Sequence, residues 1–396
     1  MATLQFGEAR ECVIAKLKAA RLAPVTEEVE LDSAAGRVLA EEVGADRDYP
    51  PLSRSIRDGF AVRTADLPGR LRVVGEVRAG EIFSGELGLG EAVEIMTGAP
   101  VPRGADAVVM IERVQRAGEH IHAPQAEPGQ FINPQGAEAR RGERVLSTGV
   151  RLGYAEIALL ATVGKPKVRV YRRPSVAIVA TGDEIVEIFE QPLDHQIRNS
   201  NACSLAVQVR RAGGLPVILP VARDSNASTQ EVLQRGLEHD LLLISGGVSV
   251  GKYDVVEQVL SELGAEFFFD RVLIQPGQPL VFGRLGKVFF FGLPGNPAST
   301  MVTFELFARA ALELLEGQAE VSLPMPLARL TTDFRHTRGL TRFLPARLSA
   351  DGAQLTPVPW RGSSDVPAQV RANAWLAAEA GRESWQAGEL MPVVLK

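Results

Sequence analysis

The chain has 396 residues, of which 45% are hydrophobic and 23% are charged, and its formal net charge is −5. This length predicts two to four domains, and the mixing of acidic and basic residues along the chain argues against DNA or RNA as a partner. No segment approaches the roughly 20 consecutive apolar residues that a membrane span needs. The N-terminus carries charges every few residues, unlike a signal peptide. We therefore expect a cytoplasmic protein that binds neither nucleic acid nor membrane.

Residues 1–45 are expected to be mainly helical, and residues 150–173 return to a helical pattern that ends at Gly164. We group these two segments as one helical domain or linker. Between them, residues 46–149 contain short β-rich runs broken by Gly and Pro, such as those at 71–77, 91–96 and 106–114. Many short strands with frequent turn signals predict a β-rich module, barrel-like or sandwich-like.

Residues 174–320 alternate apolar strands with helical segments, beginning with the strand SVAIVAT at 175–181. Strands that are apolar throughout, each followed by a helix, predict a parallel sheet covered by helices on both faces. We therefore expect a doubly wound α/β domain in this part of the chain. Residues 321–396 contain shorter strand-like pieces and predict a small C-terminal β-domain. The predicted fold class is multidomain, with α/β and β parts.

Three strand-to-helix junctions of the predicted α/β domain carry residues suited to ligand binding. Ligands bind outside the carboxyl ends of the strands in a doubly wound sheet. The junctions read TGDE (181–184), SGGVSVGKYD (245–254) and LPGNPAS (293–299). The last two are glycine-rich and run into helices, where backbone N–H groups and the helix dipole can hold phosphate. Either loop alone is as often a tight structural turn, and Asp254 could simply cap its helix.

The residue types available for a metal site favour Mg²⁺. Carboxylates beside phosphate-binding loops suit this ion, because it prefers oxygen ligands and bridges phosphate to protein. The two cysteines, Cys12 and Cys203, lie far apart, and the five histidines are dispersed along the chain. Neither a sulfur or imidazole metal site nor a Ser–His–Asp triad is therefore indicated.

Five motifs, taken together and in order, resemble the molybdopterin molybdenumtransferase family of the MoeA and gephyrin E-domain type. They are SIRDGFA (55–61), MTGAPVP (96–102), TGDE (181–184), GGVSVG (246–251) and LPGNP (293–297). The resemblance implies a homodimer of elongated subunits, whose α/β domain has the MogA-like molybdopterin-binding fold. It implies insertion of molybdate into adenylylated molybdopterin, with release of AMP and help from Mg²⁺. It also implies an active cleft between the α/β domain of one subunit and the β-rich module of the other.

The same resemblance implies roles for particular residues and partners. Five carboxylates match acidic positions of the family and would be catalytic: Asp58, Glu138, Glu184, Asp224 and Asp254. The last three would also hold the metal, although Asp224 could equally form a local Asx turn. The expected partners are adenylylated molybdopterin, molybdate and a molybdopterin adenylyltransferase. The residues expected to bind the molybdopterin substrate are Thr181, Gly182, Asp183, Ser200, Asn201, Ser245, Gly246, Gly247, Ser249, Gly251, Pro276, Gly277, Pro294, Gly295, Asn296 and Pro297.

Neutral residues replace two expected cations in the segment QPGQP (275–279). The family commonly has lysines where Gln275 and Gln278 stand, so two charges that would face the anionic substrate are absent. Their loss at a phosphate or molybdate site could cost several kcal/mol, part of which Lys252 could restore. Two further positions match the family as contacts, namely Arg198 beside the pterin or phosphate and Ser363 in the C-terminal domain.

Two alternative functions stay open. A homologue that inserts tungstate would have the same pattern, because the two oxyanions are nearly equal in size. A non-catalytic molybdopterin-binding or scaffold protein would keep the fold and lose the chemistry. The glutamines at 275 and 278 favour the scaffold, whereas the retained carboxylates argue against it, because unpaired buried carboxylates are costly to keep.

Overall fold

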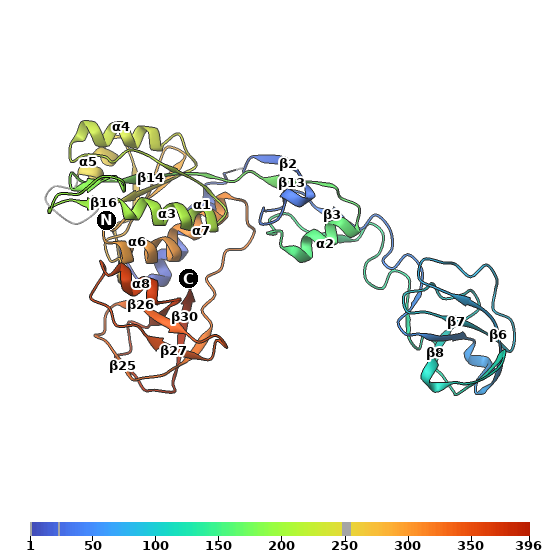
Figure 1. Ribbon diagram of the computed structural model, residues 1–396. Coiled ribbons are helices and arrows are strands. Elements are labelled where there is room, and N and C mark those ends of the chain that lie inside the picture. The colour runs from blue at the N-terminus through green and yellow to red at the C-terminus, as the bar shows by residue number, and fades with distance from the viewer. Residues whose placement is uncertain (1, 23, 248–254) are drawn as a thin grey trace.

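The computed structural model describes residues 2–22, 24–247 and 255–396. The chain forms an elongated molecule (Figure 1). An α/β domain and a C-terminal domain lie side by side at one end, a narrow linker module lies in the middle, and a β-rich distal module lies at the other end. Both chain termini lie at the α/β end (Figure 1). None of the helices in the described residues is long and apolar enough to cross a membrane.

The α/β domain is built on a six-stranded sheet in the order β17-β14-β18-β23-β22-β19. The first four of these strands are parallel, as the apolar runs predicted. The last two are an addition that the sequence analysis did not include, since β22 runs antiparallel to both its neighbours. The strands are β14 (Ser175–Ala180), β17 (Leu215–Ile218), β18 (Leu241–Ser245), β19 (Glu266–Phe269), β22 (Val281–Leu285) and β23 (Val288–Leu293).

Helices cover both faces of this sheet. Alternate residues of one strand point to opposite faces, so Ile178 belongs to one buried core and Val179 to the other. The first core lies against α1 (Phe6–Ala19), α3 (Ser200–Arg211), α6 (Pro297–Thr303) and α7 (Arg309–Leu315), with a π-helical turn, Phe304–Ala308, between the last two. The second lies against α4 (Asn226–Gly236) and α5 (Val255–Glu262). The predicted α/β fold is confirmed.

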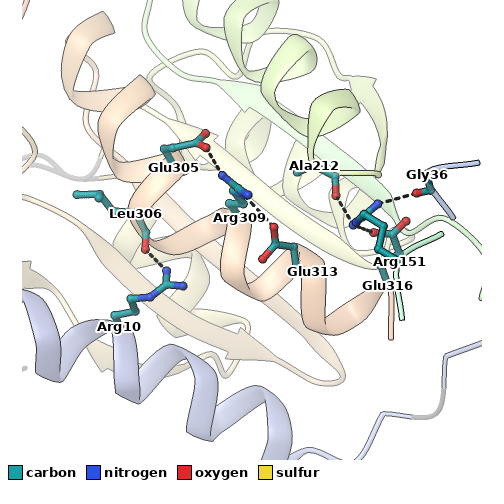
Figure 2. A network of polar contacts seen from close by, with 9 residues as sticks. All are labelled: Arg10, Gly36, Arg151, Ala212, Glu305, Leu306, Arg309, Glu313 and Glu316. Carbon is teal, nitrogen blue, oxygen red and sulfur yellow. Dashed lines mark hydrogen bonds and ion pairs between the residues drawn. The ribbon is translucent and has the colours of Figure 1, made fainter. Parts of the chain in front are cut away.

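Helix α1 lies with the α/β domain, so grouping all of residues 1–45 with residues 150–173 was wrong. Its buried residues Ala9, Val13 and Leu17 belong to the core of the α/β sheet. Arg10 donates to the carbonyl of Leu306 at 2.7 Å (Figure 2). The spacing of the three apolar residues by four places them on one helical face, which this sheet domain covers.

The linker module is built from two pairs of strands and one helix rather than from helices alone. Strand β2 pairs with β13, and β3 pairs with β12. Strands β2, β3 and β13 escaped prediction because each pairs with a partner at least 100 residues away, and β12 lies in the linker although residues 46–149 were predicted as one β-rich module. The helix α2 ends before Gly164, as predicted, where the backbone adopts a positive φ. The elements are β2 (Thr26–Glu30), β3 (Val43–Gly44), β12 (Arg144–Leu146), α2 (Tyr154–Thr162) and β13 (Lys167–Tyr171).

The distal module is β-rich, as predicted. Its six-stranded sheet has the order β8-β5-β7-β6-β10-β9, with β6 and β7 parallel. Neighbouring residues of β5 divide between two cores, Phe60 on one side and Ala61 on the other. The strands are β5 (Gly59–Val62), β6 (Gly69–Val77), β7 (Glu91–Ile95), β8 (Ala107–Met110), β9 (Gln115–Ala117) and β10 (His120–Ala123).

The C-terminal domain is a small closed sheet to which the α/β domain contributes one strand. Strand β26 pairs with both β27 and β28, which closes the order β26-β27-β24-β30-β28 on itself. Strand β21 (Ile274–Gln275) of the α/β domain pairs in parallel with β26. The other strands are β24 (Leu327–Leu330), β26 (Thr341–Leu348), β27 (Gln354–Pro357), β28 (Ala374–Ala378) and β30 (Leu390–Leu395).

A buried ion pair joins the linker module to the α/β domain. Arg151 of the linker forms an ion pair with Glu316, which follows α7 and is fully buried (Figure 2). The same guanidinium donates to the carbonyl of Gly36 at 2.6 Å, on the linker side, and to that of Ala212 at 3.4 Å, on the α/β side. Burial raises the pKa of Glu316 above its usual value, and Arg151 opposes this increase.

Replacement of Arg151 by alanine is expected to destabilise the protein by about 3 kcal/mol, because Glu316 is left as a buried charge without its partner. Denaturant unfolding measures this change. The loss should shrink as the pH falls, because a carboxyl group with a raised pKa takes up a proton and its buried charge disappears. The matched control is Arg144→Ala, whose ion pair with Glu42 has 61% and 62% exposed side chains and should cost under about 1 kcal/mol. Equal losses in both variants would contradict the prediction.

Candidate functional site

A cleft of about 910 Å³ opens between the α/β domain and the C-terminal domain. It lies at the carboxyl ends of β14, β18 and β23, the edge at which doubly wound sheets bind ligands. Most of the residues predicted to bind the substrate line this cleft. They are Thr181, Ser200, Asn201, Ser245, Gly246, Gly247, Pro276, Gly277, Pro294, Gly295, Asn296 and Pro297, together with Glu184, Arg198 and Ser363.

Backbone hydrogen bonds hold the three predicted loops against one another. The N–H of Thr181 donates to the carbonyl of Ser245 at 3.1 Å, and the N–H of Gly246 donates to that of Leu293 at 3.1 Å. These bonds continue the ladders of the three parallel strands beyond their ends. The loops that follow the strands are therefore placed side by side by the sheet itself.

The side chain of Asn201 ties the second and third loops to α3. Its Nδ2 donates to Ser245 Oγ at 2.8 Å and to the carbonyl of Gly295 at 2.7 Å. A backbone carbonyl can only accept, so the amide nitrogen must face Gly295. This orientation leaves the Oδ1 of Asn201 buried and without a hydrogen-bond partner among the described residues. A buried acceptor that lines a cleft is suited to receive a donor from a ligand.

Glycine is required at the end of β18. Gly246 and Gly247 have φ values of +92° and +63°, which side chains rarely adopt. A Cβ at Gly247 would also stand 2.7 Å from Thr181 Oγ1. The predicted glycine-rich loop thus needs its glycines for backbone conformation and for close packing, in addition to any contact with phosphate.

The acidic residues near β14 divide into two arrangements. Glu184 lines the cleft, and its carboxylate lies over Gly182, where an added Cβ would be 2.3 Å from Oε2. Asp183 and Asp224 instead bind each other, since each carboxylate accepts from the other's backbone N–H, at 3.2 and 3.4 Å. The Asp224 carboxylate thus bonds to a residue 41 positions away, which differs from the local Asx turn that the sequence analysis left open. Gly182, Asp183 and Asp224 lie beside the cleft and not on its lining.

Neither predicted catalytic carboxylate of the N-terminal half lines the cleft of the same chain. Asp58 directly precedes β5 of the distal module, whereas Glu138 lies at the border with the linker module, where its N–H donates to the carbonyl of Tyr49 at 2.8 Å. Asp58 is exposed and accepts from Thr97 twice, from its N–H at 2.6 Å and its Oγ1 at 2.8 Å. These bonds, the backbone one first, lower the pKa of Asp58. The motifs SIRDGFA and MTGAPVP are therefore joined by the hydrogen bonds between Asp58 and Thr97. Glu138 is exposed and accepts from the amide of Asn133 at 2.9 Å.

The remaining predicted positions, Ser249, Gly251 and Asp254, lie outside the described residues, as does Lys252. Within the described residues, no group of three or more His, Cys, Asp or Glu side chains is arranged to hold a metal ion.

Known proteins match the chain from end to end. Three family models match in order: the MoeA N-terminal region (domain I and II) at residues 4–164, a probable molybdopterin binding domain at 177–314, and the MoeA C-terminal region (domain IV) at 327–396. A relative from Bacillus subtilis named molybdopterin molybdenumtransferase is 36% identical over 389 residues, covering 93% of this chain and 90% of the relative. One from Synechocystis sp. with the same name is 34% identical over 376 residues, covering 92% of this chain and 93% of that relative.

The chain belongs to the molybdopterin molybdenumtransferase family. Family membership makes it a transferase and confirms the resemblance that the five motifs carried. Two crystal structures of a molybdopterin biosynthesis MoeA protein from Pyrococcus horikoshii share the fold. Their TM-scores are 0.83 and 0.76, at 30% and 33% identity, and each covers 100% of this chain, with 100% and 99% of the other chain matched.

The C-terminal domain contributes cleft residues that sequence reasoning missed. Leu340, Trp360 and Ser364 line the cleft beside Ser363. The side chain of Asn296, in the LPGNP loop, donates to Ser363 Oγ at 2.8 Å, which fastens this wall to the α/β domain. The sequence around Trp360, PVPWRGSSD, contains turn residues and no chemistry-bearing motif. Nothing in that local pattern could show that it faces a cleft formed by a distant segment.

Replacement of Asn201 by aspartate should destabilise the protein by about 1–3 kcal/mol, because a carboxylate oxygen would then oppose the carbonyl of Gly295. Thermal or denaturant unfolding at neutral pH measures the change. The matched control is Asn226→Asp, at the exposed first residue of α4, where a negative charge is tolerated or mildly stabilising. If Asn201→Asp were as stable as this control, the hydrogen bonds of Asn201 between the loops would contribute nothing to the stability of the fold.

Replacement of Thr97 by valine should raise the pKa of Asp58, because one of its two hydrogen bonds is removed and the backbone bond remains. A carboxyl group whose pKa is lowered in the folded state stabilises the fold above its unfolded pKa, and this contribution is lost as the pH falls through the folded pKa. Carboxyl-carbon NMR titration reads the pKa directly. Thr331→Val, in the C-terminal domain, is the control and should leave Asp58 unchanged. An unchanged Asp58 pKa in Thr97→Val would refute the conclusion that the Thr97 hydroxyl lowers it.

Proposed function

We propose that the protein completes molybdenum cofactor biosynthesis by inserting molybdate into adenylylated molybdopterin, with release of AMP and with Mg²⁺ as the assisting ion. The single observation that carries this proposal is the convergence of the three predicted loops on one cleft. The matched family model over this region, a probable molybdopterin binding domain, supports the same ligand. The cleft volume of about 910 Å³ is of the size that accommodates a large organic ligand.

The glycine-rich loops are suited to the phosphates of the substrate. The backbone N–H groups of Gly295 and Asn296 have no hydrogen-bond partner among the described residues, and both residues line the cleft. Oriented backbone donors of this kind hold phosphate oxygens without the need for a cation. The unpartnered Oδ1 of Asn201 would accept from an N–H or O–H group of the same ligand.

The donor set beside the loops fits Mg²⁺. This ion is usually bound by one or two carboxylates together with substrate phosphates and water, rather than by a complete set of protein ligands. Glu184 supplies an exposed carboxylate on the cleft lining. Asp224 is hydrogen-bonded to Asp183, the residue that precedes Glu184. We propose that Glu184 holds the ion, with Asp224 and Asp254 as further ligands. The ion would polarise the phosphoanhydride whose cleavage releases AMP.

A second copy of the chain would complete the site. Asp58 directly precedes β5 of the distal module, which lies at the opposite end of the molecule from the α/β domain (Figure 1), and Glu138 lies at the border between that module and the linker. We therefore propose a homodimer in which the distal module of one copy faces the cleft of the other. The two hydrogen bonds from Thr97 keep Asp58 ionised and in place. In that position it would orient or deprotonate the attacking group.

A non-catalytic binding protein is the second candidate, and one feature of the cleft favours it. Gln275 and Gln278 line the cleft with neutral amides where a cation would attract an oxyanion. Tungstate remains an alternative substrate, because the observed contacts contain no element that distinguishes two oxyanions of nearly equal size.

Release of AMP from adenylylated molybdopterin, with Mg²⁺ and with or without molybdate, tests the proposal. We expect molybdate-dependent release that falls at least about 100-fold in Asp58→Asn and in Glu184→Gln. Glu112→Gln, an exposed carboxylate of the distal module, is the matched control and should keep normal activity. Tight substrate binding without release, in molybdate and tungstate alike, would refute catalysis and leave a binding protein.

Introduction of lysine at both Gln275 and Gln278 should lower the molybdate concentration needed for half-maximal AMP release by roughly tenfold, because two cations then face the oxyanion. The gain should diminish in high salt, since salt screens exposed charges. The control Gln115→Lys adds a charge on the exposed strand β9 of the distal module. It should change neither the molybdate concentration for half-maximal AMP release nor the dependence of that concentration on salt. A double variant with unaltered molybdate dependence would show that the oxyanion binds elsewhere.

A further inference from the structure

One wall of the cleft belongs to the C-terminal domain and differs in character from the loops opposite. This C-terminal wall consists of Leu340, Trp360, Gly362, Ser363 and Ser364. Trp360 is half-buried and packs against the core of its own domain, so its indole ring is held from behind. The wall therefore presents an aromatic and an aliphatic side chain to a cleft whose opposite side is formed by polar loops.

Two connections fix this wall relative to the QPGQP segment. Strand β21 pairs with β26, and the register places Ile274 opposite Thr341 and Gln275 opposite Arg342. The backbone N–H of Ala298 donates to the carbonyl of Ser363 at 2.9 Å, beside the bond from Asn296. A ligand between Trp360 and the glutamines would thus meet a preformed site, with little ordering cost on binding.

The polar groups in this corner of the cleft have no partners of their own. The Oε1 of Gln275 is buried without a hydrogen bond, and neither the amide of Gln278 nor the indole N–H of Trp360 binds another described residue. Buried polar groups are normally satisfied, so the Oε1 of Gln275 lacks a usual partner, and the partly exposed side chains of Gln278 and Trp360 can form hydrogen bonds with a ligand. They offer both donors and acceptors, all of them neutral.

The charge of the cleft points to the same kind of ligand. Arg198 is the sole cation among the described residues that line it, and its Nε is already directed to the carbonyl of Glu190 at 3.1 Å. Within the described lining of the cleft, an oxyanion beside Trp360 would therefore have no cation other than Arg198 to bind. A flat ring with N–H groups and ring nitrogens at its edge would match both the aromatic face and the neutral amides.

We propose that Trp360, Gln275 and Gln278 form a subsite for a planar nitrogen heterocycle, the ring stacking on the indole and its edge bonding to the amides. The inference rests on the proposed function for the source of the ring, which is either the pterin or the adenine of the substrate. It assigns recognition of the substrate's base to the junction of the C-terminal domain, which supplies Trp360, with the QPGQP segment of the α/β domain. It places the phosphates on the glycine-rich loops across the cleft.

Titration of the full chain with AMP, with unsubstituted pterin, with ribose 5-phosphate and with molybdate tests the subsite. Trp375 and Trp385 are 2% and 3% exposed, so quenching of tryptophan emission by a bound ring reports mainly on Trp360. We expect AMP or pterin to quench this emission and to bind about tenfold more weakly to Trp360→Ala, as loss of a stacking partner predicts. Trp360→Phe, which keeps an aromatic face, should bind within about threefold of the original chain, as measured by calorimetry.

Val370→Ala, at an exposed residue of α8 (Val366–Arg371) in the same domain, is the control and should bind every probe normally. A response to AMP alone identifies adenine as the ring, and a response to pterin alone identifies the pterin; either supports the subsite. Normal binding of both rings by Trp360→Ala, or molybdate binding that depends on Trp360, overturns it. AMP release is measured separately, so the two proposals can fail independently. Ring binding that depends on Trp360 without AMP release would contradict the proposed function and support the subsite. AMP release that is normal in Trp360→Ala would support the proposed function and contradict the subsite.

Discussion

The alignment of β14, β18 and β23 in one parallel sheet is the constraint on which the rest of the site depends. Their ladder hydrogen bonds continue past the strand ends, from Thr181 to Ser245 and from Gly246 to Leu293. Three loops that are far apart in the chain are therefore held within bonding distance before any ligand arrives. The glycines at 246 and 247 allow this close approach, and Asn201 adds a side-chain bridge across it.

The division of the molecule into separate parts has a direct chemical consequence. The loops and Glu184 belong to the α/β domain at one end, and Asp58 belongs to the distal module at the other, with the linker module between the two (Figure 1). The position of the distal module relative to the cleft is then set at the linker junction, where the buried Glu316 is paired with Arg151. A buried ion pair contributes little net stability, but breaking it is costly, so it favours one arrangement of the two parts over others.

The two sides of the cleft offer complementary chemistry. The α/β loops present backbone donors, a carboxylate and an amide oxygen, which suit phosphates and a divalent ion. The C-terminal wall presents Trp360 and Leu340, with neutral glutamines next to them. A substrate that joins flat rings through a phosphate linkage has the same alternation of apolar and anionic parts. Under the proposed function, neutral Gln275 and Gln278 in place of the family's lysines would change how one end of the substrate is held, and the polar loops would hold the other end.

Local pattern alone determined the four parallel strands and the helices of the α/β domain, the β-rich character of the distal module and the position of three loops that line the cleft, because apolar periodicity and glycine placement act over a few residues. Tertiary structure decided the rest. Strand β2 forms because the distant strand β13 pairs with it, and α1 joins the α/β core because its apolar face fits there. Trp360 and Leu340 enter the site through the β21–β26 pairing and the hydrogen bonds of Ser363 to the LPGNP loop and α6. No short segment encodes which remote surface it meets, since that depends on the packing of the whole chain.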